Sequence, residues 1–221
     1  RGLLFESQGD YRAFARLQGR FSTELGVDIL SFCLMPNHFH LLMQAEPAAR
    51  SEFFRQLNWT FAYASNRRKD RTGHVFEQRT WSFERWGRIV VPHIARYIAL
   101  NLLVKGLADR LEDPLYSSYP MTLGKAPKPD WLRDDLLLEY FSSDPVVARQ
   151  HFRDYVQPYT FCAAAIREAG ARWLGARGCT PRGKGIVSGV EMLAYTAQVL
   201  DSRLKQAFIG ELGKLTGFEI K

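Results

Sequence analysis

Two histidines spaced one residue apart, His38 and His40, stand in the stretch MPNHFHLLM and could bind a metal ion. Side chains of a β-strand alternate between its two faces, so both imidazoles would point to one side while Phe39 points to the other. Such a pair can hold a divalent cation, but it can also be a hydrogen-bonded polar pair without a ligand. Taken alone, the spacing favours the polar pair and leaves the metal site open.

A second set of polar residues recurs at four-residue spacing in VPHIARYIALNLLVKG, whose apolar residues predict an amphipathic helix. His93, Tyr97 and Asn101 form a polar stripe on one face of this helix. A tyrosine hydroxyl can attack phosphorus when a metal ion polarises the phosphate, and an amide oxygen can complete the shell of that ion. Combined with His38 and His40, this stripe predicts phosphodiester cleavage that keeps a phosphotyrosyl bond for rejoining strands.

Other interpretations of these side chains stay open. Tyr97 could simply pack at the helix surface, as amphipathic tyrosines commonly do. Tyr63 is a rival nucleophile, but no asparagine follows it one helical turn later, and we interpret it as a packing residue. His93 could serve as a base or as a further ligand, and the simpler interpretation is a solvated histidine at the start of a helix.

The charge of the chain favours an anionic partner. Its 221 residues carry 30 Lys and Arg against 23 Asp and Glu, so the formal net charge is +7 and nucleic acid is the first candidate. The basic cluster NRRKDR and the aromatic residues after it suit phosphate contacts and base stacking along a single strand. The alternative is a solvated loop, with the tryptophans in the core. The predicted DNA-binding residues are Arg67, Arg68, Lys69, Arg71, Arg79 and Trp81.

Cysteine usage and hydropathy exclude other classes of protein. The three cysteines are far apart and odd in number, which argues against a disulfide framework or a CxxC zinc site and fits a reducing cytosol. The most apolar stretch, residues 89–107, is broken by polar side chains and predicts no membrane span. We therefore expect a cytoplasmic protein, a monomer or homodimer, that binds single-stranded DNA.

The elements that position the histidines follow from apolar spacing and turn residues. Asp10 is the predicted N-cap of a first helix that ends at Gly26. Residues 27–35 and 38–44 read as two strands joined by the turn at 36–37. The sequence therefore predicts a hairpin with both histidines directly after its turn.

The elements that follow the hairpin are mainly helical. A helix begins near Ser51 and runs into a basic loop that Gly73 closes, and residues 75–85 predict a strand pair or an extended arm. Pro92 and Gly106 mark the start and end of the helix that carries the tyrosine. Helices with antiparallel strands indicate an α+β domain, with the helices packed on the sheet.

The remainder of the chain predicts a linker and further helices. Residues 119–131 are rich in Pro, Gly and Lys, which is typical of a linker, and helices are expected from Asp144 and over 191–208. We therefore divide the chain into a catalytic domain, residues 1–122, and a helical C-terminal extension of unknown role, residues 131–221.

Several blocks in the first half of the chain resemble the REP-associated tyrosine transposases, within the one-tyrosine HUH transposases of insertion sequences. The blocks are RGLLFESQGDYRAFARL, LSFCLMPNHFHLLMQ, NRRKDRTGHVFEQRTWSF, RYIALNLLVKGL and YSSY, in the family's order, and MPNHFHLL is the most specific. The resemblance implies a ferredoxin-like fold, a Mg²⁺ or Mn²⁺ ion, and cleavage of single-stranded DNA near palindromic hairpins. Binding of hairpin DNA and association with the nucleoid are implied only by this resemblance. It implies that His38, His40 and Asn101 bind the metal ion and that Tyr97 is the nucleophile.

Departures from the family pattern favour an alternative function. Family members commonly read NPVRAGLV where this chain has NLLVKGLA, with Leu102 for the proline and Val104 for the arginine. Glu77 adds a negative charge near the predicted DNA-binding arm. Val104 and Glu77 favour a domesticated or inactive relative that binds structured DNA or RNA without cutting, whereas the retained His38, His40 and Tyr97 favour the enzyme. The usual first strand would precede Arg1, which would leave a gap in the sheet.

Overall fold

A computed structural model describes residues 3–76, 90–113, 116–158 and 160. The predicted α+β class is confirmed: a two-stranded antiparallel sheet is packed between helices. In chain order the elements are α1 (Gln8–Leu25), β1 (Asp28–Met35), β2 (His38–Gln44), α2 (Pro47–Arg68), α3 (Val90–Val104), α4 (Tyr119–Thr122), α5 (Asp134–Leu138) and α6 (Pro145–Val156).

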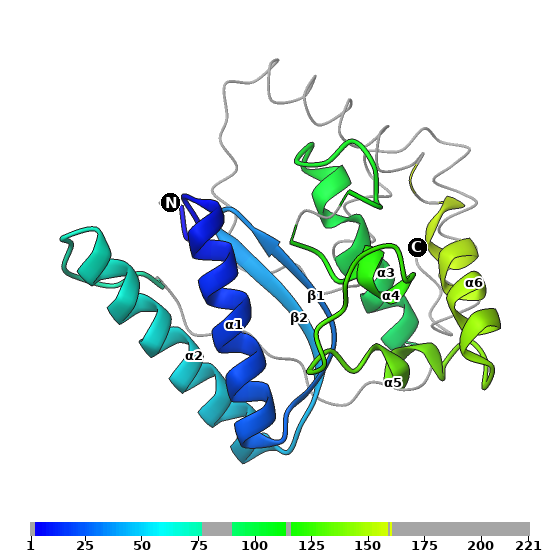
Figure 1. Ribbon diagram of the computed structural model, residues 1–221, viewed down its shortest axis with the longest axis horizontal. Helices are drawn as coiled ribbons and strands as arrows, with labels where there is room; N and C mark the ends of the chain where they lie inside the picture. Colours follow the sequence, from blue (N-terminus) through cyan, green and yellow to red (C-terminus); the bar gives the residue numbers. More distant parts are fainter. Residues whose placement is uncertain (1–2, 77–89, 114–115, 159, 161–221) are drawn as a thin grey trace, which may run out of the picture.

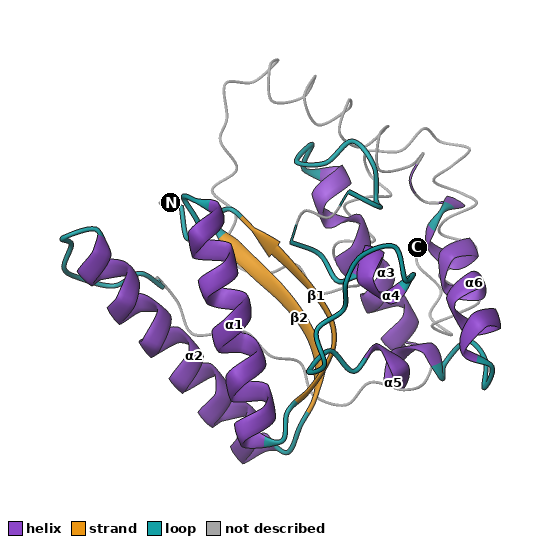
Figure 2. Cartoon of the chain, in the orientation of Figure 1, coloured by secondary structure: helices purple, strands orange, loops and turns teal. Residues whose placement is uncertain are grey.

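The sheet separates two helical layers (Figures 1 and 2). Helices α1 and α2 lie together on one side of β1 and β2, while α3, α5 and α6 lie on the other. Each layer has its own apolar core. Phe32 and Leu34 of β1 face the first layer, and Cys33 and Met35 face the second. This is the alternation expected of a strand that is buried on both faces.

The predicted hairpin is formed by β1 and β2. Met35 pairs with His38 and Cys33 with His40 across the two strands. An irregularity between Ile29 and Ser31 shifts the register further from the turn. Both histidines therefore lie on the same face of β2, the face that is turned toward α3.

The start of α1 differs from the prediction. Ser7 is the N-cap, and Asp10 is the third helical residue, which completes a capping box with Ser7. Asp10 reads as a cap from the sequence because it precedes the apolar stripe, yet its carboxylate reaches back to the N–H groups of Glu6 and Ser7. The end of the helix agrees with the prediction, since Gly26 has φ 64°.

Helices α2 and α3 carry the predicted cluster and stripe, with small differences at their ends. Helix α2 begins at Pro47 rather than near Ser51 and continues to Arg68, so the first part of the predicted basic loop is helical. Helix α3 has Pro92 in its first turn, and Gly106, with φ 67°, follows its end. The predicted strand pair or arm lies largely in residues 77–89, outside the described residues.

The first part of the predicted linker, residues 119–122, is instead part of the core, whereas residues 124–130 are largely exposed. Tyr119 opens the short helix α4 and is only 2% exposed. Immediately before it, residues 116–118 run along the free edge of β1, where Leu34 N–H donates to Tyr116 O (2.9 Å) and Ser118 N–H to Phe32 O (3.0 Å). Composition suggested a linker because it does not reveal these tertiary contacts.

The described part of the predicted C-terminal extension packs on the same core. Leu132 forms a parallel bridge with Ile29 of β1. Asp144 caps α6 as predicted, and Phe152 of α6 packs beside Tyr119. The proposed division of the chain at residues 122 and 131 stays a prediction. In the described ranges, no helix is long and apolar enough to cross a membrane.

Candidate active site

The two histidines of β2 are in direct contact. His38 Nε2 and His40 Nε2 lie 3.1 Å apart, and their rings are nearly perpendicular, at 87°. His38 Nδ1 lies 2.7 Å from Asn37 Oδ1. Because an amide oxygen only accepts hydrogen bonds, Nδ1 of His38 carries the proton and Nε2 presents a lone pair. The turn residue thus sets the tautomer that a metal ligand needs.

His40 is a neutral imidazole at physiological pH. Burial lowers the pKa of His40 to about 3, and the positive charges of His38 and Lys105 act in the same direction. Across the hairpin, the buried side chain of Cys33 is its register partner. A neutral ring can coordinate a cation, whereas a protonated ring cannot.

Tyr97 of α3 lies against this pair. Its ring meets the ring of His40 edge to face, with centroids 5.3 Å apart and planes at 77°. Burial raises the pKa of the Tyr97 hydroxyl, a hydrogen bond from the Asn101 side chain lowers it in part, and the nearby Cys33 thiol raises it. The structure therefore brings the predicted nucleophile to the predicted metal ligands from a different element.

Asn101 lies one turn after Tyr97 and is 4% exposed. Its Nδ2 donates to Tyr97 O (2.9 Å), so the amide nitrogen is used within the helix. The carbonyl oxygen Oδ1 is the atom of this side chain that could bind a cation. Asn101 thus stands at the site, although its nitrogen also has a structural role.

The arrangement fits a divalent cation. Two nitrogens about 2.1 Å from one ion and at a right angle to each other lie about 3.0 Å apart, close to the spacing of this pair. The described residues contain no group of three His, Cys, Asp or Glu side chains that could hold a metal ion. The two imidazoles with the amide oxygen of Asn101 would make a sparse shell, with positions left for water or phosphate oxygens.

His93 is bonded rather than solvated, contrary to the sequence-based interpretation. Its Nδ1 lies 2.6 Å from the hydroxyl of Tyr155 in α6 and 3.0 Å from a guanidinium nitrogen of Arg96. The Arg96 guanidinium also lies over the Tyr155 ring, 4.5 Å from its centroid. These three side chains connect the start of α3, one turn before Tyr97, to α6.

Residues 3–101 match the family model described as transposase IS200 like. This part of the chain is similar to the IS200-like transposases. The matched span runs from the residues before α1 to Asn101 in α3, and it contains every predicted metal ligand and the predicted nucleophile. No curated protein and no solved structure matches the chain. The match supports the one-tyrosine transposase family, its HUH fold, and a DNA transposase or endonuclease role in general.

The predicted DNA-binding cluster of the IS200-like segment is engaged in ion pairs. Arg68 pairs with Asp10 (2.7 Å), Lys69 with Glu6 (2.8 Å), and Arg71 with Glu6 (3.3 Å). These pairs join the end of α2 to the start of α1. Three of the four predicted cations therefore stabilise the packing of two helices, whatever they contribute to DNA binding.

The other predicted DNA-binding residues divide into two groups. Arg67 is exposed in the last turn of α2 and has no ion-pair partner among the residues that the structure describes. Arg79 and Trp81 lie in residues 77–89, outside the described residues. Their roles stay predictions.

Sequence reasoning missed two residues at the site. Cys33 lies opposite His40, and this could have been found by counting back from the turn at 36–37 along the hairpin. Tyr155 bonds to His93 from a position 62 residues later in the chain. No local pattern points to that contact, because it depends on how α6 packs on α3.

Proposed function

We propose that the chain is a metal-dependent DNA transposase or endonuclease of the REP-associated tyrosine class, which cleaves and rejoins single-stranded DNA near palindromic hairpins. The observation that carries the proposal is the contact between the His38–His40 pair of β2 and the Tyr97 ring of α3. The match of this segment to the IS200-like transposases supports it.

In the proposed reaction, His38 Nε2, His40 and Asn101 Oδ1 would hold Mg²⁺ or Mn²⁺. When bound there, the cation would polarise the scissile phosphate and favour attack on phosphorus. The lone pair of His38 Nε2 is already presented, because Asn37 fixes its tautomer. His40 is already a neutral ring, because its pKa lies far below neutrality, but its Nε2 donates to His38 Nε2, so its proton must move to Nδ1 before Nε2 can bind the cation.

Tyr97 supplies the nucleophile in this reaction. Because burial raises the pKa of its hydroxyl, the phenol keeps its proton at neutral pH and must lose it as the bond from Oη to phosphorus forms. The bond between phosphorus and the sugar oxygen breaks, and the sugar hydroxyl leaves. Attack by a sugar hydroxyl on the phosphotyrosyl bond reverses the step and rejoins the strand.

Replacing Tyr97 by Phe tests this role. Tyr97→Phe removes the nucleophile but keeps the ring beside His40, so strand cleavage should fall to background while hairpin binding changes little. The measurement is the covalent protein–DNA adduct formed with labelled hairpin DNA and Mn²⁺, separated under denaturing conditions. Tyr140→Phe, at an exposed tyrosine that follows α5, is the matched control and should form the adduct at the parent rate.

Two outcomes would contradict the proposal. An adduct that persists in Tyr97→Phe and maps to Tyr63 would move the nucleophile to α2. A parent chain that binds the hairpin but forms no adduct with either cation would favour a domesticated relative that binds without cutting.

A further inference from the structure

The outer face of α2 carries a pair of aromatic side chains that are exposed to solvent. Trp59 is 65% exposed and Tyr63 56%, which makes them the most exposed aromatic residues in the described part of the chain. Their rings lie nearly parallel, at 11°, with centroids 5.6 Å apart. Large flat apolar surfaces of this kind are usually buried or used for binding.

Cations flank the aromatic pair along the same face. Arg55, Trp59, Tyr63 and Arg67 recur at four-residue spacing, so they form one row along the helix, which we term the α2 stripe. Twelve residues of helix span about 18 Å, the length of several nucleotides of an extended single strand. The charge is asymmetric: Glu52 neutralises Arg55 (2.6 Å), whereas Arg67 has no ion-pair partner among the described residues.

We propose that the α2 stripe binds single-stranded DNA, with unpaired bases stacked on Trp59 and Tyr63 and a phosphate beside Arg67. Aromatic rings accept the flat face of any base, while a cation at the end of the row binds the backbone, which is the usual composition of a single-strand contact. The net charge of +7 favours this occupant over a second copy of the chain, which carries the same charge. The inference rests on the proposed function and adds a substrate contact to it.

This surface is separate from the candidate active site. Helix α2 lies on the side of the sheet opposite α3 (Figure 1). The stripe would therefore hold a part of the DNA strand away from the point of cleavage. Its loss should weaken DNA binding and raise KM, while kcat at saturating DNA stays near the parent value.

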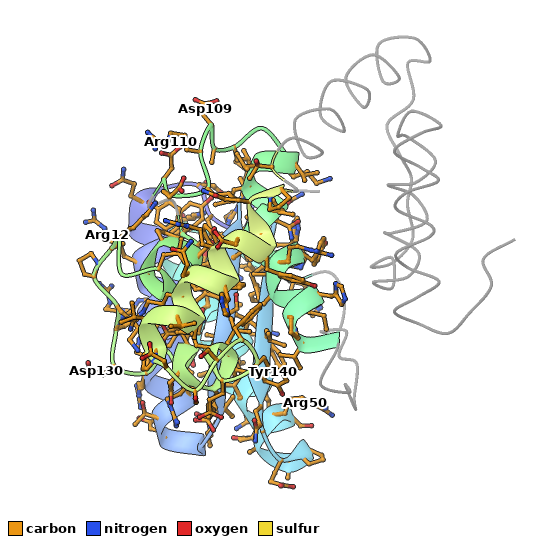
Figure 3. All side chains as sticks on the ribbon, turned by 90° about the vertical axis from the view of Figure 1, so that its right-hand side faces the viewer. Arg12, Arg50, Asp109, Arg110, Asp130 and Tyr140 are labelled. Carbon is orange, nitrogen blue, oxygen red and sulfur yellow. The ribbon has the colours of Figure 1, made fainter. Side chains whose placement is uncertain are left out.

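The test compares two oligonucleotides of equal length and charge, oligothymidylate and an abasic strand, by fluorescence anisotropy with the full-length chain. Trp59→Ala should lower the affinity for oligothymidylate by about 5- to 100-fold and leave the affinity for the abasic strand nearly unchanged, because only the base stacks. Trp59→Phe keeps a ring and should retain most of the affinity. Tyr140→Ala is the matched control, since Tyr140 is an exposed tyrosine on the face shown in Figure 3, beyond α5.

Each other outcome overturns the proposal in an identifiable way. If Trp59→Ala and the parent bind oligothymidylate with equal affinity, the α2 stripe does not bind DNA. This result would not affect the proposed function, which the Tyr97 adduct assay tests separately. An equal loss on both strands would overturn stacking as the cause. If the parent self-associates and Trp59→Ala is monomeric with DNA binding unchanged, the stripe is an interface between copies. A parent that binds neither strand nor hairpin would overturn the proposed function as well.

Discussion

At the scale of single residues, His38 and His40 differ in what prepares each ring to bind a metal ion. Asn37 fixes the tautomer of His38 through a hydrogen bond, whereas burial keeps His40 neutral. Either ring alone would be an ordinary polar side chain on a strand. Together they present two nitrogens 3.1 Å apart, which are joined by a shared hydrogen bond. A cation could replace that hydrogen bond once the Nε2 proton of His40 has moved to Nδ1.

The first prediction at this scale concerns metal affinity. His38→Ala and His40→Ala should each weaken Mn²⁺ binding by at least about 10-fold, since loss of a ligand should cost no less than loss of a residue that orients one. Mn²⁺ should support cleavage at least as well as Mg²⁺, because imidazole nitrogens suit it better. Isothermal titration calorimetry measures the affinity, with His74→Ala, at an exposed histidine, as the control. Full cleavage in excess EDTA would show that no metal ion is needed.

A second prediction at this scale concerns acid stability without metal. The pKa of His40 is about 3 in the folded chain and about 6.5 in the unfolded one, so the unfolded state binds more protons between these values. The contribution of His40 to stability is therefore complete above pH 6.5 and is lost as the pH falls toward 3. The melting temperature of the parent should fall more steeply from pH 7 to 4 than that of His40→Gln, measured in chelator. Parallel curves would contradict the shifted pKa.

At the scale of the elements, the hairpin could be predicted from the sequence. The contacts that the later helices make with the sheet and with one another could not. A turn dipeptide between two alternating apolar runs defines both strands and places the histidines on one face, so this part of the site follows from local pattern. The helix with Tyr97 was also predictable from its spacing. That its ring meets His40 depends on how α3 packs on the sheet. The burial of Tyr119 in a stretch resembling a linker, and the bond of Tyr155 to His93, depend on contacts with distant segments.

The start of α1 provides a prediction at the element scale. The Asp10 carboxylate accepts hydrogen bonds from the N–H groups of Glu6 and Ser7 (3.0 Å each) and pairs with Arg68, which joins α1 to α2. Asp10→Asn removes the charge and one acceptor oxygen, so it should lower the free energy of unfolding by about 1–3 kcal/mol in chemical denaturation. Glu24→Gln, in an exposed pair with Arg20, should cost less than about 0.5 kcal/mol.

The pH dependence of Asp10 checks the same prediction. Burial raises the pKa of Asp10. Hydrogen bonds from Glu6 and Ser7 and the charge of Lys69 lower this pKa by a larger amount, so the net shift is downward. A lowered pKa means that the contribution of Asp10 is present above about pH 3.8 and is lost as the pH falls below that value. Asp10→Asn should therefore lie closer to the parent at pH 3 than at pH 7. A constant difference would contradict this role of the carboxylate.

At the scale of the whole molecule, the net charge of +7 does not mean that every basic cluster is free to bind DNA. Four cations lie at the end of α2 and in the loop after it, but Glu6, Asp10 and Asp70 lie in or beside the same cluster, which leaves a local formal charge of 4 − 3 = +1. These ion pairs hold α1 and α2 together. Of the four cations, Arg67 has no acidic partner among the described residues, so it can bind a phosphate without breaking an ion pair.

The salt dependence of DNA binding separates these roles. Neutralising Arg67, Arg68, Lys69 and Arg71 together should weaken binding of all single strands about equally and flatten the salt dependence, by a slope of roughly 0.7 per lost phosphate contact, because each docked cation releases condensed counterions. Sequence preference should change little, since phosphates carry no base identity. Arg67→Gln alone should flatten the slope without a change in melting temperature, whereas Arg68→Gln should lower the melting temperature through its lost pair with Asp10. An unchanged slope in the quadruple variant would place the phosphate contacts elsewhere, and Arg79, Arg182 and Lys184, all outside the described residues, would be the next cations to neutralise.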